Sequence, residues 1–325
     1  MYVLSCPHLP EGAQTPVGSE VYRGLTARPK MLSPWLFYDA RGSDLFEQIT
    51  ELPEYYPTRT ERSILSAHAD QIVAAAAGCE RLTMIELGAG TATKTGLLLK
   101  AAVRLQDEVT YHAIDVSRTA LDEAKRRIEA ELEGVAVVPR VGDYTEGLGR
   151  VEADGQRRMV LYIGSSIGNF EPEDALQLLR DIRRELKAGE KLLLGVDMIK
   201  NCEVLLRAYD DAAGVTAAFN KNVLARINRE LGANFNLDLF RHRALWNEER
   251  SRIEMHLESR IAQRVVVPAL ELEVKLQRGE TIHTENSYKF RDEGVIEMLE
   301  RADFCLSDHW TDNCDWFGVY LATAW

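Results

Sequence analysis

The sequence lacks the cysteine and histidine patterns that hold disulfide frameworks or metal ions. Its 325 residues include five cysteines, an odd number, at scattered positions and without a C-x-x-C pair. Such spacing is typical of reduced thiols in the cytosol rather than of disulfides. The seven histidines form no H-E-x-x-H motif or similar cluster, so we expect no structural or catalytic metal.

Long apolar runs and an excess of positive charge are also absent. No run approaches the ~18 residues that span a bilayer, and the amino-terminal stretch lacks the pattern of a secretory signal peptide. The 39 basic residues are outnumbered by 51 acidic ones, which gives a formal net charge of −12. Because nucleic-acid backbones and anionic membranes attract basic surfaces, we expect neither as a partner. We expect a cytoplasmic protein that acts as a monomer.

A glycine turn is the most informative feature that is present. Residues 84–87 have the pattern of a short buried strand, Gly88 and Gly90 that of a tight turn, and the residues that follow that of a helix start. Glycines let the backbone take dihedrals that a Cβ forbids and approach a ligand closely. A second strand ends at Asp115, where an acid can accept both hydroxyls of a ribose. Together these elements predict the nucleoside-binding first half of a doubly wound α/β domain.

The residues around the glycines indicate which nucleoside is bound. A dinucleotide site expects G-x-G-x-x-G, but here Thr93 stands where the third glycine would be. Glu86 would repel phosphates, whereas it suits a cationic ligand such as S-adenosylmethionine, which has no phosphate. The pattern E-L-G-A-G-T at residues 86–91, with Asp115 after it, resembles motif I and the ribose-binding acid of class I methyltransferases. A nicotinamide-dependent oxidoreductase and a purely structural turn are the alternatives.

From residue 62 the sequence alternates between helical and strand patterns. We expect helices over 62–77, 94–106, 118–132 and from 171, and strands over 82–87, 110–114, 135–141, 159–163 and 191–195. After residue 200 we expect one or two helices over 201–231, strands over 240–263 and 266–276, and a polar-rich strand or loop over 281–290. A helix over 294–302 and a Trp-rich segment with no assigned element follow. This pattern predicts a Rossmann-like α/β methyltransferase domain (62–198 plus 290–325) and a second, discontinuous α+β substrate-binding domain (8–61 plus 199–289).

The ends of the third and fourth expected strands are further candidates, because ligands of doubly wound sheets bind beyond the carboxyl ends of the strands. After the fourth strand, Gly164 and Gly168 leave room for a ligand and Asn169 offers an amide. After the third, the Asp143 carboxylate can accept from the amine of an adenine and the Tyr144 ring can stack on it. Alternatively, Asn169 caps the next helix, and Asp143 and Tyr144 form an ordinary polar turn.

Four longer runs, at residues 37–46, 52–59, 164–169 and 209–220, carry a more specific resemblance. They are similar to the L-histidine Nα-methyltransferase family of ergothioneine biosynthesis, and the resemblance extends from about residue 22 onward. Members of that family transfer three methyl groups from S-adenosylmethionine to the α-amine of histidine, giving hercynine. The resemblance implies the same activity and the same cofactor here.

The resemblance also implies roles for individual residues. Those expected to contact S-adenosylmethionine are Tyr38, Gly88, Lys94, Asp115, Asp143, Tyr144, Gly164 and Ser165. Those expected to bind L-histidine are Tyr55, Asn169 and Tyr209 at its carboxylate and amine, Glu285 and Ser287 at its imidazole, and Met255 along the imidazole pocket. Tyr38 and Asn169 would act at the reacting amine. Asn286 and Tyr288 depart from the smaller residues usual in the family.

These residue types suit methyl transfer to nitrogen. The reaction is an in-line displacement that needs a neutral amine aimed at the sulfonium methyl, so orientation supplies much of the rate. The Tyr38 ring can stabilise the growing ammonium charge by ~0.5–2 kcal/mol, and Glu285 can accept from an imidazole N–H. The alternatives are methylation of another amino acid or histidine derivative, and a non-catalytic module that binds an adenosine ligand.

Overall fold

The chain folds into two compact units, each built from separate segments of the sequence. The computed structural model describes residues 10–142, 148, 151 and 156–325. Unit 1 consists of residues 1–56 and 201–287, and unit 2 of residues 57–200 and 288–325. The junctions differ by a few residues from those suggested by the sequence, in part because helix α3 (Tyr56–Ala77) begins before residue 62 and Asn201 caps helix α8 (Cys202–Tyr209).

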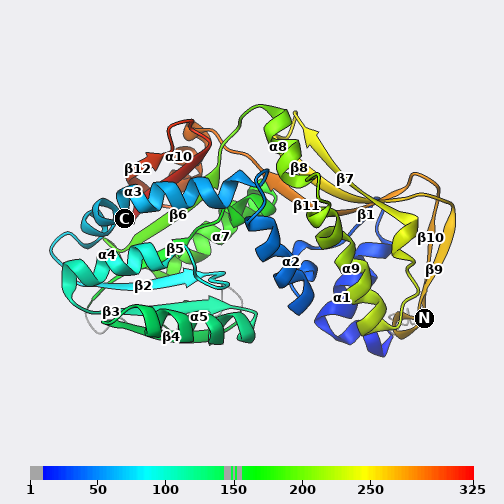
Figure 1. The fold of residues 1–325 in the computed structure, drawn as a ribbon, viewed down its shortest axis with the longest axis horizontal. Coiled ribbons are helices and arrows are strands. Elements are labelled where there is room, and N and C mark those ends of the chain that lie inside the picture. Colours follow the sequence, from blue (N-terminus) through cyan, green and yellow to red (C-terminus); the bar gives the residue numbers. More distant parts are fainter. Residues whose placement is uncertain (1–9, 143–147, 149–150, 152–155) are drawn as a thin grey trace, which may run out of the picture. The chain divides into compact units, whose positions relative to one another are not determined.

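A seven-stranded sheet forms the centre of unit 2 (Figure 1). Its parallel strands are β2 (Leu82–Leu87), β3 (Val109–Asp115), β4 (Val135–Val141), β5 (Arg157–Tyr162) and β6 (Lys191–Asp197), and the hairpin of β12 (Phe304–Thr311) and β13 (Phe317–Ala324) joins β6 through antiparallel pairing. The order is β12-β13-β6-β5-β2-β3-β4, so the winding direction reverses between β2 and β5. Ligands of such sheets bind at this reversal, beyond the carboxyl ends of the strands.

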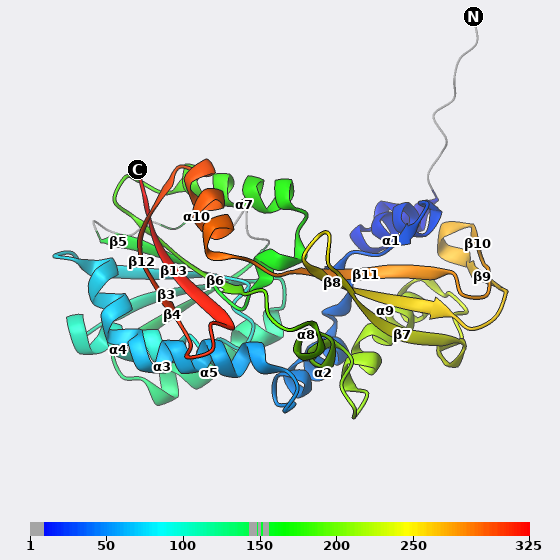
Figure 2. The ribbon, with the colours of Figure 1, turned by 90° about the horizontal axis from the view of Figure 1, so that it is seen from above.

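Helices cover both faces of this sheet (Figures 1 and 2). One face is covered by α3, α4 (Gly96–Gln106) and α5 (Arg118–Glu131), and the other by α7 (Pro172–Glu185) and α10 (Asp292–Arg301). Leu65, Leu98 and Leu121 belong to the core on the first face, and Leu179 and Leu299 to the core on the second. With both faces covered, every residue of β2 and β6 is buried, which explains why most of their side chains are apolar.

The hairpin of β12 and β13 corresponds to the segment that the sequence left without an assigned element. Strand β12 lies at the edge of the sheet with only two of its eight residues buried, so it shows no clear alternation of apolar and polar residues. Strand β13 is buried along nearly its whole length and lies between β6 and β12. These two strands therefore complete the sheet of unit 2.

Unit 1 contains a four-stranded sheet in the order β1-β11-β8-β7 and a separate hairpin of β9 and β10. The strands are β1 (Lys30–Met31), β7 (Phe240–Asn247), β8 (Arg252–Ser259), β9 (Gln263–Val267), β10 (Leu272–Leu276) and β11 (Thr281–Tyr288), and the helices are α1 (Pro16–Thr26), α2 (Ala40–Thr50), α8 and α9 (Val215–Leu231). Short 3-10 helices cover Glu11–Gln14, Pro34–Phe37, Leu237–Leu239 and Pro268–Leu270. In the described part of the chain, no helix combines the length and apolar character that crossing a membrane requires.

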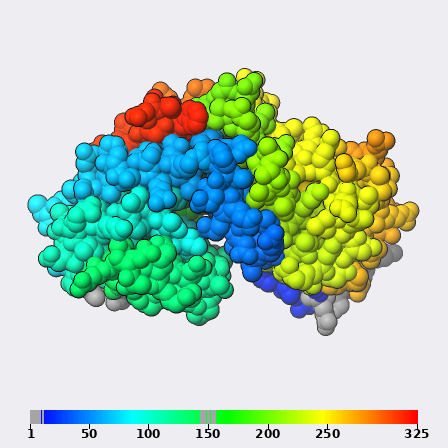
Figure 3. All heavy atoms as spheres, viewed as in Figure 1, coloured from blue at the N-terminus to red at the C-terminus, as the bar shows by residue number. Residues whose placement is uncertain are grey.

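Helices α2 and α9 lie side by side, and their atoms adjoin at the surface in Figure 3. The Asp39 carboxylate caps α2 by accepting from the Gly42 backbone N–H at 2.7 Å, and it also accepts from Asn222 of α9 at 2.8 Å. Just before α2, the Phe37 ring packs on Phe219 of α9 with 4.5 Å between ring centroids. These contacts fix the backbone on both sides of Tyr38.

A buried ion pair at the amino ends of β5 and β6 gives a test of this fold. Arg158 donates two hydrogen bonds to Glu190, at 2.9 and 2.7 Å, and both side chains are 8% exposed. Removing one partner leaves a buried charge without compensation, which typically costs about 3–5 kcal/mol. We expect Arg158→Met to lower the free energy of unfolding, measured by urea denaturation, by about that amount.

The matched control removes both charges. The double variant Arg158→Met with Glu190→Leu should regain much of the lost stability, because no unpaired charge stays in the protein. A double variant no more stable than Arg158→Met alone would contradict this account of the pair.

Candidate active site

The turn after β2 is fastened to the end of β3. Gly88 and Gly90 both have positive φ, at 73° and 52°, a conformation that favours glycine. The Asp115 carboxylate accepts from the Gly90 backbone N–H at 2.9 Å and from the Ser117 N–H at 2.8 Å. A Cβ added to Gly90 would meet no atom within 4 Å. The structure thus brings Gly88 and Asp115 together at neighbouring strand ends, with open space beside the turn.

Glu86, the acid before the glycines, lies beneath the turn and is 3% exposed. It accepts a hydrogen bond from the Thr95 hydroxyl at 2.6 Å and another from the Tyr111 hydroxyl. Burial raises its pKa to about 7, although these hydrogen bonds and the charge of Lys94 act to lower it. Glu86 therefore joins the residue before α4 to β3, and its charge depends on pH near neutrality.

Glu61 of α3, which the sequence analysis did not single out, contacts two of the expected site residues. Its side chain is fully buried, forms an ion pair with Lys94 and accepts from the Gly164 backbone N–H at 2.8 Å. It thereby connects two residues expected to bind the cofactor. The sequence contained a signal, since residues 61, 64, 65 and 72 share one helix face and the other three are buried Ile64, Leu65 and Ile72.

The loop after β5 is bent by two consecutive residues with positive φ, Gly164 at 83° and Ser165 at 60°. The Ser165 hydroxyl oxygen accepts from the Asp197 backbone N–H at 2.9 Å, which ties this loop to the end of β6. Asn169 ends the 3-10 helix Ser166–Asn169 and is partly exposed. Helix α7 is instead preceded by Glu171 as its capping residue, so the alternative that Asn169 caps it is wrong.

Two expected cofactor residues, Asp143 and Tyr144, lie outside the residues that the structure describes. The charged groups at the neighbouring strand ends nevertheless test the fit of a cofactor. Asp115 and Glu86 are acids, and the cationic Lys94 is already paired with Glu61. Such a set suits a ligand with a cationic sulfonium and a ribose better than one with phosphates.

The expected substrate residues of unit 1 include a connected group of aromatic rings. Tyr38 contacts Phe46 at 5.8 Å between centroids, Phe46 contacts Tyr55 at 6.3 Å, and Tyr55 contacts Tyr209 at 6.2 Å. The Tyr209 and Ser287 hydroxyls share a hydrogen bond of 2.6 Å. The structure therefore brings Tyr38, Tyr55, Tyr209 and Ser287 into one group, in which Tyr38 is the most exposed tyrosine, at 37%.

Met255 and Glu285 lie on the neighbouring strands β8 and β11. Met255 is 2% exposed, and its backbone carbonyl accepts from the Thr284 hydroxyl at 3.0 Å. Glu285 is partly exposed, and its carbonyl oxygen lies 3.0 Å from Nε2 of His283. Tyr288, at the end of β11, donates from its hydroxyl to the Glu171 carboxylate at 2.7 Å, so this departure from the family pattern contacts the start of α7.

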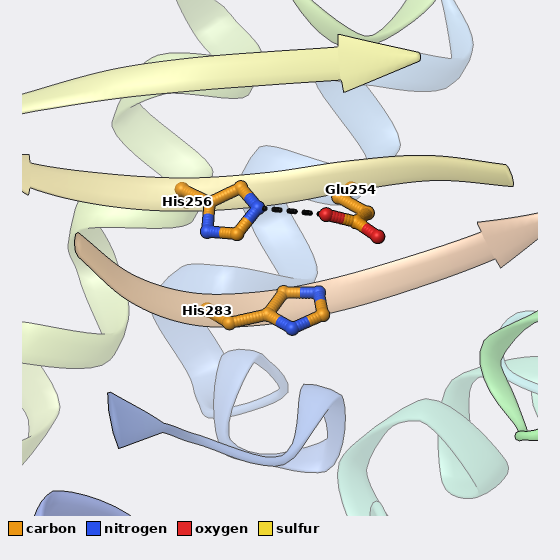
Figure 4. A group of neighbouring side chains, drawn as sticks. All are labelled: Glu254, His256 and His283. Carbon is orange, nitrogen blue, oxygen red and sulfur yellow. Dashed lines mark hydrogen bonds and ion pairs between the residues drawn. The ribbon is translucent and has the colours of Figure 1, made fainter. Parts of the chain in front are cut away.

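Glu254, His256 and His283 bring metal-ligand side chains together, with candidate atoms within 4.8 Å of one another (Figure 4). Burial raises the pKa of Glu254, but hydrogen bonds from Asn247, Arg252 and His256 bring it down to about 2. Burial also lowers the pKa of both histidines, which favours their neutral forms. The imidazoles stack at 4.6 Å instead of converging on one point. We interpret this group as a packing contact in which His256 of β8, held by Glu254, stacks on His283 of β11.

The fold and the turn together define the class of this protein. The doubly wound sheet with an inserted antiparallel strand, the glycine turn and the acid after the next strand are features of the class I S-adenosylmethionine-dependent methyltransferases. The third glycine of a dinucleotide site is replaced by Thr93. The oxidoreductase alternative therefore loses the signature on which it would depend.

Comparison with known proteins identifies the family within this class. The sequence model described as "Histidine-specific methyltransferase, SAM-dependent" matches residues 17–324, and the chain belongs to this family. The "Histidine N-alpha-methyltransferase" of Mycolicibacterium smegmatis is 48% identical over 303 residues, 93% of each chain. The protein of the same name from Mycobacterium tuberculosis is 43% identical over 323 residues, 99% of each chain. The "Ergothioneine biosynthesis protein 1" of Schizosaccharomyces pombe is 28% identical over 296 residues, which cover 89% of this chain and 38% of that protein.

The pKa of Glu86 predicts how cofactor binding depends on pH. A cationic cofactor favours the ionised carboxylate, so binding below pH 7 requires Glu86 to release a proton. We expect the affinity for S-adenosylmethionine, measured by calorimetry, to increase about three- to tenfold between pH 6 and pH 8. The folding stability of the cofactor-free protein should instead decrease over this pH range. The raised pKa of Glu86 stabilises the fold at low pH, and this stabilisation is lost as the pH rises through about 7.

Two variants isolate this effect. Glu86→Gln has no titrating group at position 86, so its affinity for the cofactor should not change with pH over this range. Glu108→Gln removes an exposed acid that pairs with Arg81, and it should keep the slope of the unmodified protein. An unchanged slope in Glu86→Gln would show that another group titrates.

Proposed function

We propose that this protein transfers methyl groups from S-adenosylmethionine to the α-amine of L-histidine, giving hercynine for ergothioneine biosynthesis. The observation that carries the proposal is the match to the histidine-specific methyltransferases over residues 17–324. The two related histidine N-alpha-methyltransferases, which align over nearly their whole length, support the same substrate.

The proposed cofactor contacts belong mainly to unit 2. Asp115 would hold the ribose hydroxyls, and the glycine turn at Gly88 would let the backbone approach the ligand. Lys94, Gly164 and Ser165 would contact the rest of the cofactor, with Asp143 and Tyr144 at the adenine and Tyr38 near the methyl group. When bound, S-adenosylmethionine supplies an electrophilic methyl on a sulfonium.

The groups proposed to bind the carboxylate and amine of the substrate are neutral hydroxyls and an amide. Tyr55 and Tyr209, with Asn169 from unit 2, would hold the carboxylate and amine of histidine. Glu285 and Ser287 would bind its imidazole, and Met255 would line that pocket. The hydrogen bond between Tyr209 and Ser287 supports this assignment, because it couples a residue proposed for the backbone of the amino acid to one proposed for its side chain. Neutral groups also avoid placing a cation beside the sulfonium.

The chemical step follows from this arrangement. The amine lone pair forms a bond to the methyl carbon while the carbon–sulfur bond breaks, and its electron pair stays on sulfur. The protein's own contribution is to orient the neutral amine in line with that bond. The Tyr38 ring would stabilise the developing ammonium by cation–π attraction, worth ~0.5–2 kcal/mol. Each further transfer requires the amine to lose a proton to water first.

Mass spectrometry tests the proposed reaction directly. Purified protein incubated with S-adenosylmethionine and an equal mixture of the natural amino acids should add three methyl groups to histidine and none to the other amino acids. Methylation of a different amino acid would keep the reaction and overturn the substrate. Cofactor binding without any methylated product would favour a non-catalytic binding module.

Glu285 gives a test of histidine selectivity. We expect Glu285→Ala to weaken histidine binding about tenfold or more, since loss of a hydrogen bond to a buried partner costs about 1–3 kcal/mol. Binding of phenylalanine, which has no imidazole N–H, should change little. The control Glu273→Ala removes an acid that is 44% exposed on β10, and it should leave both affinities unchanged. Equal losses for histidine and phenylalanine would refute the imidazole role.

We also propose that the enzyme acts as a monomer in the cytoplasm. The cysteines of the described residues, Cys79, Cys202, Cys305 and Cys314, are free and exposed, which suits a reducing compartment. Exposed apolar side chains such as Leu105, Val141 and Val266 lie on separate elements, and scattered residues of this kind need no partner.

A further inference from the structure

Glu61 carries a charge at a place where the fold alone would favour an apolar side chain. It lies on the buried face of α3, near Ile64 and Leu65, and its side chain is fully buried. A buried ion pair is often no more stabilising than apolar residues of similar volume, so stability alone gives little reason for it. We propose that Glu61 is a positioning residue for the cofactor, because it holds the loops after β2 and β5 in one arrangement.

One carboxylate makes both connections. Its Oε2 pairs with the Lys94 ammonium, and its Oε1 accepts from the Gly164 backbone N–H at 2.8 Å. A Cβ added to Gly164 would lie 3.2 Å from the Lys94 nitrogen, so the two loops are in close contact. Gly195 of β6 leaves room for the Glu61 side chain, because a Cβ at that position would lie 2.3 Å from Oε1 of Glu61. Glu61 therefore contacts residues on or following three neighbouring strands.

The ion pair between Glu61 and Lys94 also balances the positive charge of Lys94. Lys94 is 22% exposed, at the sheet edge where a cationic cofactor is proposed to bind. An unpaired ammonium there would attract the carboxylate of that cofactor but repel both its sulfonium and its amine. Glu61 neutralises the ammonium while leaving it in place. Among the contacts described for Glu61, all are within unit 2, so the proposed role does not depend on unit 1.

The test compares two buried carboxylates of unit 2. Glu61→Gln keeps the shape but removes the charge, and Glu190→Gln does the same beside Arg158 at the amino ends of the strands. We expect Glu61→Gln to weaken binding of S-adenosylhomocysteine, measured by calorimetry, at least tenfold, with KM for histidine within twofold of the unmodified protein. Glu190→Gln should lower the unfolding midpoint and leave the cofactor affinity unchanged.

Two further readouts separate positioning from a loss of folding. In the free protein, hydrogen exchange at the Gly164 amide should be faster in Glu61→Gln than in Glu190→Gln. The pH midpoint for binding S-adenosylmethionine should also move to lower values, because Glu61 raises and Lys94 lowers the pKa of Glu86. If Glu61→Gln does not fold, Glu61→Asp retains the charge on a shorter side chain that cannot reach both partners, and it should bind the cofactor with intermediate affinity.

The inference rests on the proposed function, and the experiment separates their failures. If the unmodified protein does not bind S-adenosylhomocysteine, the proposed function is wrong. If it binds and the Glu61 variants bind within twofold of it, or if Glu190→Gln weakens binding as much as Glu61→Gln, only the positioning role is wrong.

Discussion

Acidic side chains, three of them buried, hold the loops at the carboxyl edge of the unit 2 sheet, and the geometry of the cofactor half depends on them. Asp115 accepts from the backbone of the turn after β2, Glu86 from the Thr95 hydroxyl, and Glu61 from the backbone of the loop after β5. At the end of β6, Asp197 pairs with Lys289 at 2.8 Å and also with Lys200. Asp115 and Glu61 satisfy backbone donors of these loops, whereas Glu86 and Asp197 contact side chains.

This arrangement also sets the electrostatic character of the site. Acids at this edge suit a cationic ligand, and Lys94, Lys200 and Lys289 there are already paired with acids. Unit 1 presents a different chemistry, with tyrosine rings and hydroxyls around Ser287. A methyl transfer that creates a quaternary ammonium needs both features: acids that tolerate positive charge, and neutral groups that orient an amine.

The sequence predicted those parts of the molecule that depend on neighbouring residues. The parallel strands, the glycine turn and the acid at Asp115 follow from local patterns, and the structure has them. The pairing of Glu61 with Lys94 and Gly164 spans 33 and 103 positions, so only the fold reveals it. Strand β12 lacked a recognisable pattern because an edge strand buries few side chains. The tyrosine group was suggested by family resemblance, since single tyrosines carry no local signal of their contacts.

The position of β13 has a consequence for synthesis of the chain. This strand, residues 317–324, lies inside the sheet between β6 and β12. Until it leaves the ribosome, β6 has an open edge with unpaired backbone groups, and such an edge invites pairing with other chains. Unit 1 must likewise wait for residues 201–287 to join its amino-terminal segment. Neither unit can therefore finish folding early in translation, and nascent chains of intermediate length are the stage at which aggregation is the greatest hazard.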